Sequence, residues 1–204
     1  MIDHLVYATP DIDASVAFLA AEWGITATPG GSHPGGGTRN ALIALGPSSY
    51  LEIIGPDSEQ PAPPGARPFG IDELTEPRLV TWAARVDGIE ETVERARGRG
   101  FDPGPVIPLS RRRPDGVVLE WRLTFPSGLG DGIVPFLIEW DTSEHPAQSS
   151  AGGARLLRFR GEHPRPDELR AMLKALDLDL EVAGAAEPAL IAVIETPRRR
   201  GELR

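Results

Sequence analysis

The sequence predicts an α+β protein made of two repeated modules and a C-terminal segment. The order strand, helix, strands occurs twice within the first 142 residues, and a related order follows after residue 154. We place the modules at about 1–56 and 78–142, together forming one domain over 1–142, with the segment at 154–197. Roughly 40 residues without cysteine are too few to be stable alone, so the segment is expected to pack on the modules.

The first module opens with a strand over 2–8, followed by a helix on which Ile12, Val16 and Leu19 share one face and which ends at Gly24. Strands over 40–45 and 49–54 form a hairpin, since only a short turn separates them. Glycine and proline are concentrated between Pro29 and Gly37, which predicts a loop there.

The second module repeats this order. A strand over 79–86 precedes a helix carrying Ile89, Val93 and Ala96, which lie 77 positions after their counterparts in the first helix. Strands over 117–123 and 133–140 follow, and the proline-rich stretch from Pro103 to Pro114 predicts a loop. The pattern of elements repeats, although the residues themselves do not.

The C-terminal segment reads as a βαββ unit. Residues 155–160 alternate as a strand, a helix begins at Pro166, and strands follow near 178–183 and 189–196. The run from Arg198 to Arg200 is expected to be a solvated tail.

Composition excludes several classes of protein. The formal charge is −9, which argues against nucleic acid as a partner, and no apolar run approaches the roughly 20 residues of a membrane span. The absence of cysteine excludes zinc–thiolate sites and cysteine nucleophiles. The start of the chain has no signal-peptide pattern, so we expect a cytoplasmic protein.

Three side chains suggest a divalent-metal site. His4 lies in the first strand, while Glu52 and Glu139 lie inside apolar strands near the ends of the two modules. A carboxylate in an apolar strand is costly unless it is paired, hydrogen-bonded or bound to a metal. Without cysteine, Mn²⁺, Fe²⁺, Ni²⁺ or Zn²⁺ fits such a donor set. The alternative is that each glutamate pairs with an arginine.

Other segments suggest substrate contacts. A glycine-rich loop carrying His33, Thr38 and Arg39 is suited to a mobile lid from Gly30 to Arg39, the alternative being a plain surface loop. Its glycines have no strand directly before them and no helix after, so no nucleotide cofactor is expected. Trp121 is a candidate for stacking a flat ligand, and the arginines 111–113 are either an anion site or partners of acidic residues.

The chain resembles the glyoxalase-like domain proteins of the vicinal oxygen chelate (glyoxalase/bleomycin resistance/dioxygenase) superfamily. The resemblance rests on IDHLVYATPDID, HPGGGTRNALIALG followed by YLEIIG, SRRRPDG and PFLIEW, in that order. It implies paired βαβββ modules whose sheets curl into a cleft. In the enzymes of this superfamily a divalent metal lies in the cleft, held by the first and last strands of each module.

Carried over by position, the resemblance implies His4, Glu52 and Glu139 as metal ligands, with the two glutamates as catalytic groups. The fourth position, 77 residues after His4, is Thr81, which is not a usual ligand.

The implied function is that of a metal-dependent lyase, isomerase or dioxygenase acting on a small oxygen-rich molecule. The alternative is a metal-free protein that sequesters a drug or toxin, and a structural dimer module is the third interpretation. A small-molecule ligand is the expected partner, and a homodimer is compatible with the sequence.

Overall fold

The computed structural model describes residues 1–113, 115–125, 131–141 and 144–204. Its first module follows the predicted order, with one strand more than the sequence suggested. The elements are β1 (Ile2–Ala8), α1 (Ile12–Trp23), β2 (Thr28–His33), β3 (Thr38–Gly46) and β4 (Ser49–Pro56). The Asp11 side chain caps α1 by accepting the Ala14 N–H at 3.0 Å, and Gly24 ends the helix in the left-handed conformation, at φ 71°.

The second module repeats the first after a short 3-10 helix, η1 (Pro68–Glu73). Its elements are β5 (Arg78–Arg85), α2 (Ile89–Gly98), β6 (Val106–Arg112), β7 (Val118–Thr124) and β8 (Phe136–Trp140). A short helix α3 (Pro146–Ser149) leads to the C-terminal segment, which consists of β9 (Arg155–His163), α4 (Pro166–Ala175), β10 (Glu181–Gly184), β11 (Ala189–Glu195) and β12 (Arg200–Leu203).

Three strands correct the sequence-based expectations. Residues 28–33 form β2 rather than the start of a loop, and residues 106–112 form β6 within the proline-rich stretch. The expected solvated tail contains β12, which pairs with β11. With β12, the C-terminal segment has the element order βαβββ.

The two modules share one eight-stranded sheet, and the predicted α+β class is confirmed. The strand order is β2-β3-β4-β1-β5-β8-β7-β6, so the first strands of the two modules are neighbours at its centre. They run antiparallel with Leu5 opposite Trp82, residues that are 77 positions apart. The repeat therefore has an approximate two-fold axis at this pair.

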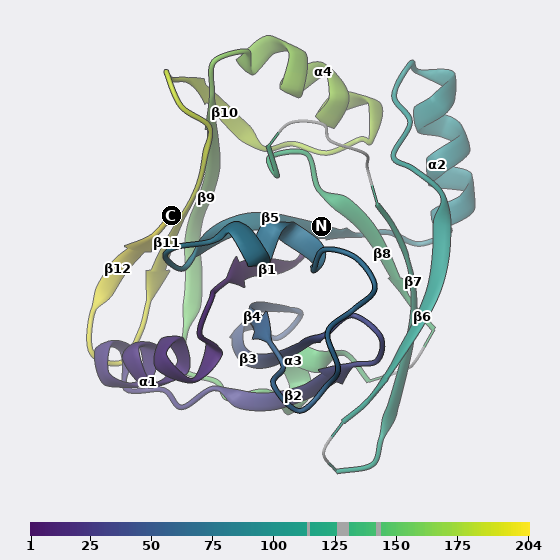
Figure 1. The fold of residues 1–204 in the computed structure, drawn as a ribbon. Helices are drawn as coiled ribbons and strands as arrows, with labels where there is room; N and C mark the ends of the chain where they lie inside the picture. The colour runs from purple at the N-terminus through teal and green to yellow at the C-terminus, as the bar shows by residue number, and fades with distance from the viewer. Residues whose placement is uncertain (114, 126–130, 142–143) are drawn as a thin grey trace.

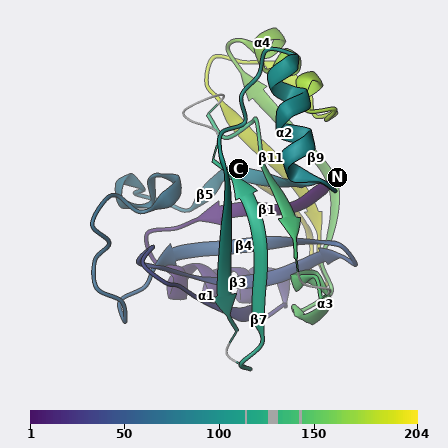
Figure 2. The same ribbon diagram turned by 90° about the vertical axis from the view of Figure 1, so that its right-hand side faces the viewer.

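The eight-stranded sheet is strongly curled (Figures 1 and 2). In Figure 2, β7 of the second module crosses β3 and β4 of the first at a steep angle. The edge strands β2 and β6 come into contact, and a Cβ atom on Gly31 would lie 2.9 Å from the Arg112 carbonyl oxygen. Glycine in β2 thus permits this close approach, which encloses space on the concave face.

The C-terminal segment forms its own four-stranded sheet, ordered β10-β9-β11-β12. In Figure 1, β9, β11 and β12 stand together at one edge of the molecule, with α4 above them and α1 below. The main hydrophobic core joins this sheet to both modules, because Leu5, Trp82, Leu169 and Leu190 belong to one buried cluster. The segment therefore packs on the modules, as predicted.

Candidate functional site

A cavity of about 240 Å³ lies on the concave face of the eight-stranded sheet. Strands alternate their side chains between faces, so β1 directs His4 to this side and Leu5 to the opposite core. The lining is mainly aromatic and aliphatic, with few polar groups, as is typical of small-molecule sites. Its aromatic members are Tyr50, Phe69, Trp121, Phe125, Phe136 and Trp140.

Glu52 is the carboxylate of this cavity. It lies on β4 and is only 8% exposed. Its Oε1 accepts the Asn40 amide N–H at 2.5 Å and lies 3.8 Å from His33 Nε2, while its Oε2 lies 3.7 Å from His4 Nε2. Both imidazole Nε2 atoms are beyond hydrogen-bond distance of the carboxylate, so neither ring is hydrogen-bonded to Glu52.

Asn40 and Arg111 fix the position of Glu52 through a chain of hydrogen bonds. The Arg111 guanidinium donates to Asn40 Oδ1, which orients the amide so that its NH₂ group faces Glu52. Arg111 is 4% exposed, and burial lowers its pKa. Among the described residues, its Nε is the one buried side-chain polar atom without a hydrogen-bond partner. The cavity wall thus holds a cation with an unused donor.

His33 completes the polar side of the cavity. Its Nδ1 lies 3.0 Å from Thr38 Oγ1, and its Nε2 lies 3.4 Å from Asn40 Nδ2. Desolvation in the cavity wall, opposed by Glu52 and reinforced by Arg111, lowers the pKa of His33 to about 4. His33 is therefore neutral at pH 7. The Asn40 N–H identifies Nε2 as the acceptor, so Nδ1 carries the proton and donates to Thr38.

His4 is held by a buried carboxylate. Its Nδ1 donates to Asp3 Oδ1 at 2.7 Å, so Nε2 faces the cavity. The other oxygen, Oδ2, accepts from Trp140 Nε1 at 3.0 Å and from His145 Nε2 at 2.9 Å. Burial alone raises the pKa of Asp3, but the bonds from His145 and His4 outweigh it and hold that pKa well below its usual value. Tyr50 stacks on His4 with ring centroids 4.6 Å apart.

The positions of the second module that correspond to His4 and Glu52 carry no imidazole and no carboxylate. Across the two-fold axis Val6 lies opposite Thr81 and Ala83 lies opposite His4, so Thr81 is the counterpart of His4. Val6 pairs with Glu52 on β4, and its counterpart Ala83 pairs with Phe136 on β8. Phe136 therefore occupies the position that Glu52 has in the first module.

Glu139 lies outside the cavity, which corrects its expected role as a metal ligand and catalytic group. It follows Ile138 on β8 and faces the opposite side of the sheet. Its two carboxylate oxygens accept the backbone N–H groups of Gly88 and Ile89 at 2.8 and 3.0 Å, and Arg122 pairs with it at 2.7 Å. Glu139 therefore caps α2 instead of meeting His4 and Glu52.

The glycine-rich segment is also different from the expected lid. His33 and Thr38 line the cavity as proposed, but they belong to paired strands, and only residues 34–37 connect β2 to β3. Arg39 faces away from the cavity and pairs with Asp13 at 2.7 Å on the surface. Trp121 lines the cavity, as the sequence suggested.

The described residues do not form the four-ligand metal site that the family resemblance implies. His4 and Glu52 are present, but Thr81 offers only a neutral hydroxyl and Phe136 offers no donor at all. Within the described ranges, no group of three or more His, Asp or Glu side chains is arranged to hold a metal ion. We therefore derive no chemical step through a metal.

Sequence reasoning did not include Asn40 and Asp3 among the residues of this site, although each left a signal. Asn40 begins an apolar strand in the alternating register that also contains Thr38, and Asp3 directly precedes His4. Arg111 belongs to the run of arginines 111–113, for which the sequence predicts either an anion site or ion pairs with acidic residues. The structure separates them, since Arg113 pairs with Asp115 and Glu144.

Comparisons with known proteins identify the fold. Residues 2–176 match the glyoxalase-like domain family. A hypothetical protein from Staphylococcus aureus is similar in structure, with a TM-score of 0.70 and 14% identity over 97% of this chain and 92% of that one.

Methylmalonyl-CoA epimerases are more distant structural neighbours. The protein from Streptomyces coelicolor, in complex with 2-nitronate-propionyl-CoA, gives a TM-score of 0.48 and 21% identity over 72% of this chain and 98% of that one. The protein from Mycobacterium tuberculosis gives 0.46 and 17% over 70% and 88%. No curated protein matches the sequence. None of the helices in the described ranges has the length and apolar character needed to cross a bilayer.

Proposed function

Because the chain belongs to the glyoxalase-like domain family of the vicinal oxygen chelate superfamily, we propose that it catalyses proton transfer on a small carbonyl compound. One observation carries the proposal. Glu52 lies in a mainly apolar cavity with an imidazole on each side, at 3.7 and 3.8 Å. A carboxylate between two imidazoles in a mainly apolar cavity is suited to general base catalysis.

The proposed reaction begins with removal of a proton from the carbon beside a carbonyl group. Glu52 takes the proton, and the electron pair of the C–H bond becomes an enolate. The buried positive charge of Arg111, which lines the same cavity, stabilises the negative oxygen of the enolate. Return of the proton to the same carbon gives an epimerase, and return to a neighbouring atom gives an isomerase.

The two histidines present fixed nitrogen atoms to a bound molecule in this scheme. Asp3 holds His4 by Nδ1, so its Nε2 is the atom presented to Glu52 and to a bound molecule. A carboxylate behind an imidazole fixes the orientation of the ring, which is the role that Asp3 has toward His4 in this scheme. His33 stays neutral, because burial lowers its pKa, and its Nε2 accepts from Asn40.

The test measures hydrogen exchange in phenylpyruvate. Its methylene group is acidic, its carboxylate suits Arg111 and its ring suits the aromatic wall. We expect wild-type protein in D₂O to exchange the methylene protons faster than buffer does, and Glu52→Gln to lower this rate at least about 100-fold. Binding measured by calorimetry should change little. Glu139→Gln, on the other face of the sheet, is the matched control and should retain the rate.

A second function is favoured by the second module. Thr81 and Phe136 replace donors by a hydroxyl and an aromatic ring, which suits a metal-free protein that sequesters an aromatic ligand. In that case phenylpyruvate binds, but the exchange rate with wild-type and Glu52→Gln proteins is the same as in buffer. This outcome would contradict the enzymatic proposal.

A further inference from the structure

A second, larger cleft adjoins the cavity that contains Glu52. It has a volume of about 1000 Å³, and four residues line both spaces, namely Pro68, Phe69, Phe125 and Phe136. The smaller cavity, at about 240 Å³, lies below the roughly 300–1,000 Å³ usual for ligand sites. A molecule larger than the smaller cavity can therefore extend past this shared wall into the larger cleft.

We propose that the cleft is a second binding compartment, in which Arg78 binds a terminal carboxylate or phosphate of an elongated substrate. This proposal rests on the proposed function, because it places the reactive end of the same molecule beside Glu52. It adds the chemical class of the other end, which must be anionic.

Among the described residues that line the cleft, Arg78 is the arginine whose side chain has no partner. Arg204 pairs with Glu202 at 2.8 Å, and Arg199 pairs with Glu22 at 2.8 Å. Within the described part of the chain, Arg78 makes no side-chain hydrogen bond or ion pair. An arginine without a partner can offer its parallel N–H groups to one carboxylate or phosphate.

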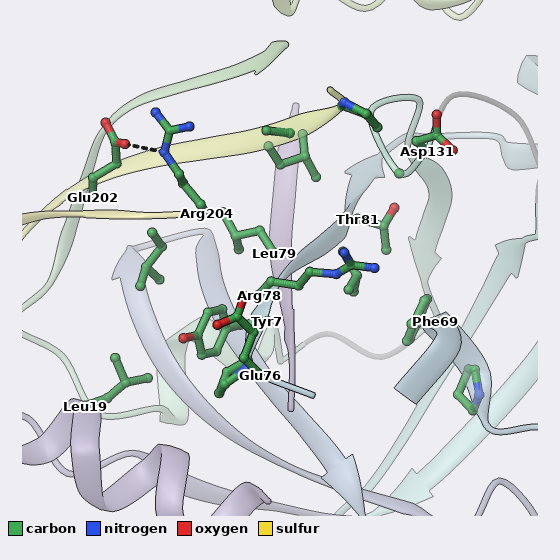
Figure 3. A pocket seen from close by; sticks show the side chains of 18 of the residues that line it. Tyr7, Leu19, Phe69, Glu76, Arg78, Leu79, Thr81, Asp131, Glu202 and Arg204 are labelled. Carbon is green, nitrogen blue, oxygen red and sulfur yellow. Dashed lines mark hydrogen bonds and ion pairs between the residues drawn. The ribbon is translucent and has the colours of Figure 1, made fainter. Parts of the chain in front are cut away.

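The charges around Arg78 are arranged to leave its guanidinium free. Figure 3 shows its side chain extending across the cleft toward Thr81 and Phe69, with Glu76 on the other side next to Tyr7. The charge of Glu76 acts there, since it adds to burial in raising the pKa of Tyr7. Asp131, which also lines the cleft, pairs with His163 at 3.1 Å.

Phe69 separates the two compartments and is held there at a cost. It adopts φ 61° and ψ 19°, a left-handed conformation that is strained for a residue with a side chain. Its ring stacks on Phe136 with centroids 6.2 Å apart. Because strained residues persist where surrounding structure fixes them, this conformation supports a role for η1 in shaping the shared wall.

The C-terminal sheet builds the far wall of the cleft. Leu190 of β11 and Leu203 of β12 line it, and both lie beyond residue 176, where the match to the family ends. The cleft therefore depends on a part of the chain outside the matched domain, and its specificity belongs to this protein rather than to the domain alone.

The experiment compares three eight-carbon 2-oxo acids by calorimetry with the full-length protein. 2-Oxooctanoate ends in a methyl group, 2-oxosuberate in a carboxylate and 8-phosphono-2-oxooctanoate in a phosphonate. We expect at least one charged probe to bind about 10-fold more tightly than the methyl probe, as expected for a charge-assisted bond. The two charged probes distinguish a carboxylate site from a phosphate site.

The variants assign this preference to one side chain. Arg78→Gln should bring the charged and methyl probes to equal affinity, whereas Arg78→Lys should keep part of the preference. Arg155→Gln removes an exposed arginine of the C-terminal sheet and is the matched control, which should behave as wild type. Arg78 is exposed, so its substitution does not disturb the core.

Two results overturn the proposal, namely equal affinity of all three probes for wild type and a preference that survives in Arg78→Gln. The exchange experiment on phenylpyruvate separates this from the proposed function. A preference that depends on Arg78, together with no exchange that depends on Glu52, leaves the compartment in place and removes only the enzymatic assignment.

Discussion

At the scale of single residues, Glu52 shows how a carboxylate remains in an apolar strand. Burying an unpaired charge is costly, whereas a hydrogen bond to a charged group contributes about 1.5–3 kcal/mol. Asn40 provides that bond, and Arg111 fixes the orientation of Asn40. Gly30 makes room for this arrangement, because a Cβ atom there would lie 2.1 Å from Asn40 Oδ1.

His33 makes the stability of the protein depend on pH. Its pKa is lowered from 6.5 to about 4 in the folded state, so the unfolded chain binds a proton in this range that the native protein does not. The contribution of His33 is therefore complete above pH 6.5 and is lost as the pH falls toward 4. The free energy of unfolding should decrease by up to about 1.4 kcal/mol per pH unit in this window.

Urea unfolding of wild type and His33→Asn between pH 7 and 4.5 measures this effect. Asparagine does not titrate, so the variant should lose less stability than wild type on acidification, whatever its stability at pH 7. Parallel dependences on pH would show that the folded protein does not hold His33 neutral.

The face of the sheet on which His4, Glu52 and Trp121 lie could be predicted, because strand alternation alone decides it. His4, Glu52 and Trp121 line the cavity, as do His33 and Thr38. The position of Glu139 was not predicted correctly, because the assignment depended on the number of residues between equivalent positions of the two modules. An offset of 87 relates it to Glu52, whereas the pairing of β5 with β8 gives an offset of 84. A shift of an odd number of residues reverses the face of a strand.

At the scale of elements, the N-terminus of helix α2 is capped by a side chain from a strand. Gly88 precedes the helix with φ 73° and has no side chain with which to cap it. Glu139 of β8 provides the cap, since its carboxylate accepts two backbone N–H groups at the positive end of the helix dipole. These two hydrogen bonds link α2 to the eight-stranded sheet.

Replacing Glu139 by alanine should therefore destabilise the fold. We expect a loss of about 1–2 kcal/mol, the usual range for a helix cap, measured by urea unfolding at pH 7. Arg39→Ala breaks only an exposed ion pair with Asp13 and should cost less than about 1 kcal/mol. Equal losses in the two variants would contradict the capping role.

Two of the three strands missed by sequence reasoning have an unusual composition. β2 reads TPGGSH and β6 contains Pro108, both patterns typical of loops. They are the two edge strands of the sheet, where proline is tolerated and where glycine permits close contact between strands. Local sequence cannot show this, because the tolerance comes from the position in the sheet.

At the scale of the whole molecule, the C-terminal segment is part of the core. Trp82 of β5 packs edge-to-face on Phe159 of β9, with ring centroids 5.5 Å apart, and Ile133 packs against Gly161. The class, the two modules and the packing of the segment could be predicted from periodicity and size. The pairing of β1 with β5 could not, because strand order across modules has no local signal.

Ending the chain at residue 153 should abolish cooperative folding. The truncation exposes Trp82, Ile133 and other core residues that the segment covers, and removes one wall of the larger cleft. We expect the truncated protein to lack a sigmoidal thermal transition by circular dichroism, whereas the full chain shows one. A cooperative melt of the truncated protein would disprove the shared core.

The buried carboxylate of Asp3 also constrains the order of assembly during synthesis. Its partners Trp140 and His145 follow it by 137 and 142 residues, so most of the chain must leave the ribosome before they exist. Until then Asp3 needs water, since a buried charge without partners is unfavourable. The first module therefore cannot form the full hydrogen-bond network around Asp3 and His4 by itself. Closing so long a loop carries an entropic cost, so we expect the surroundings of His4 to be among the last parts of the protein to form.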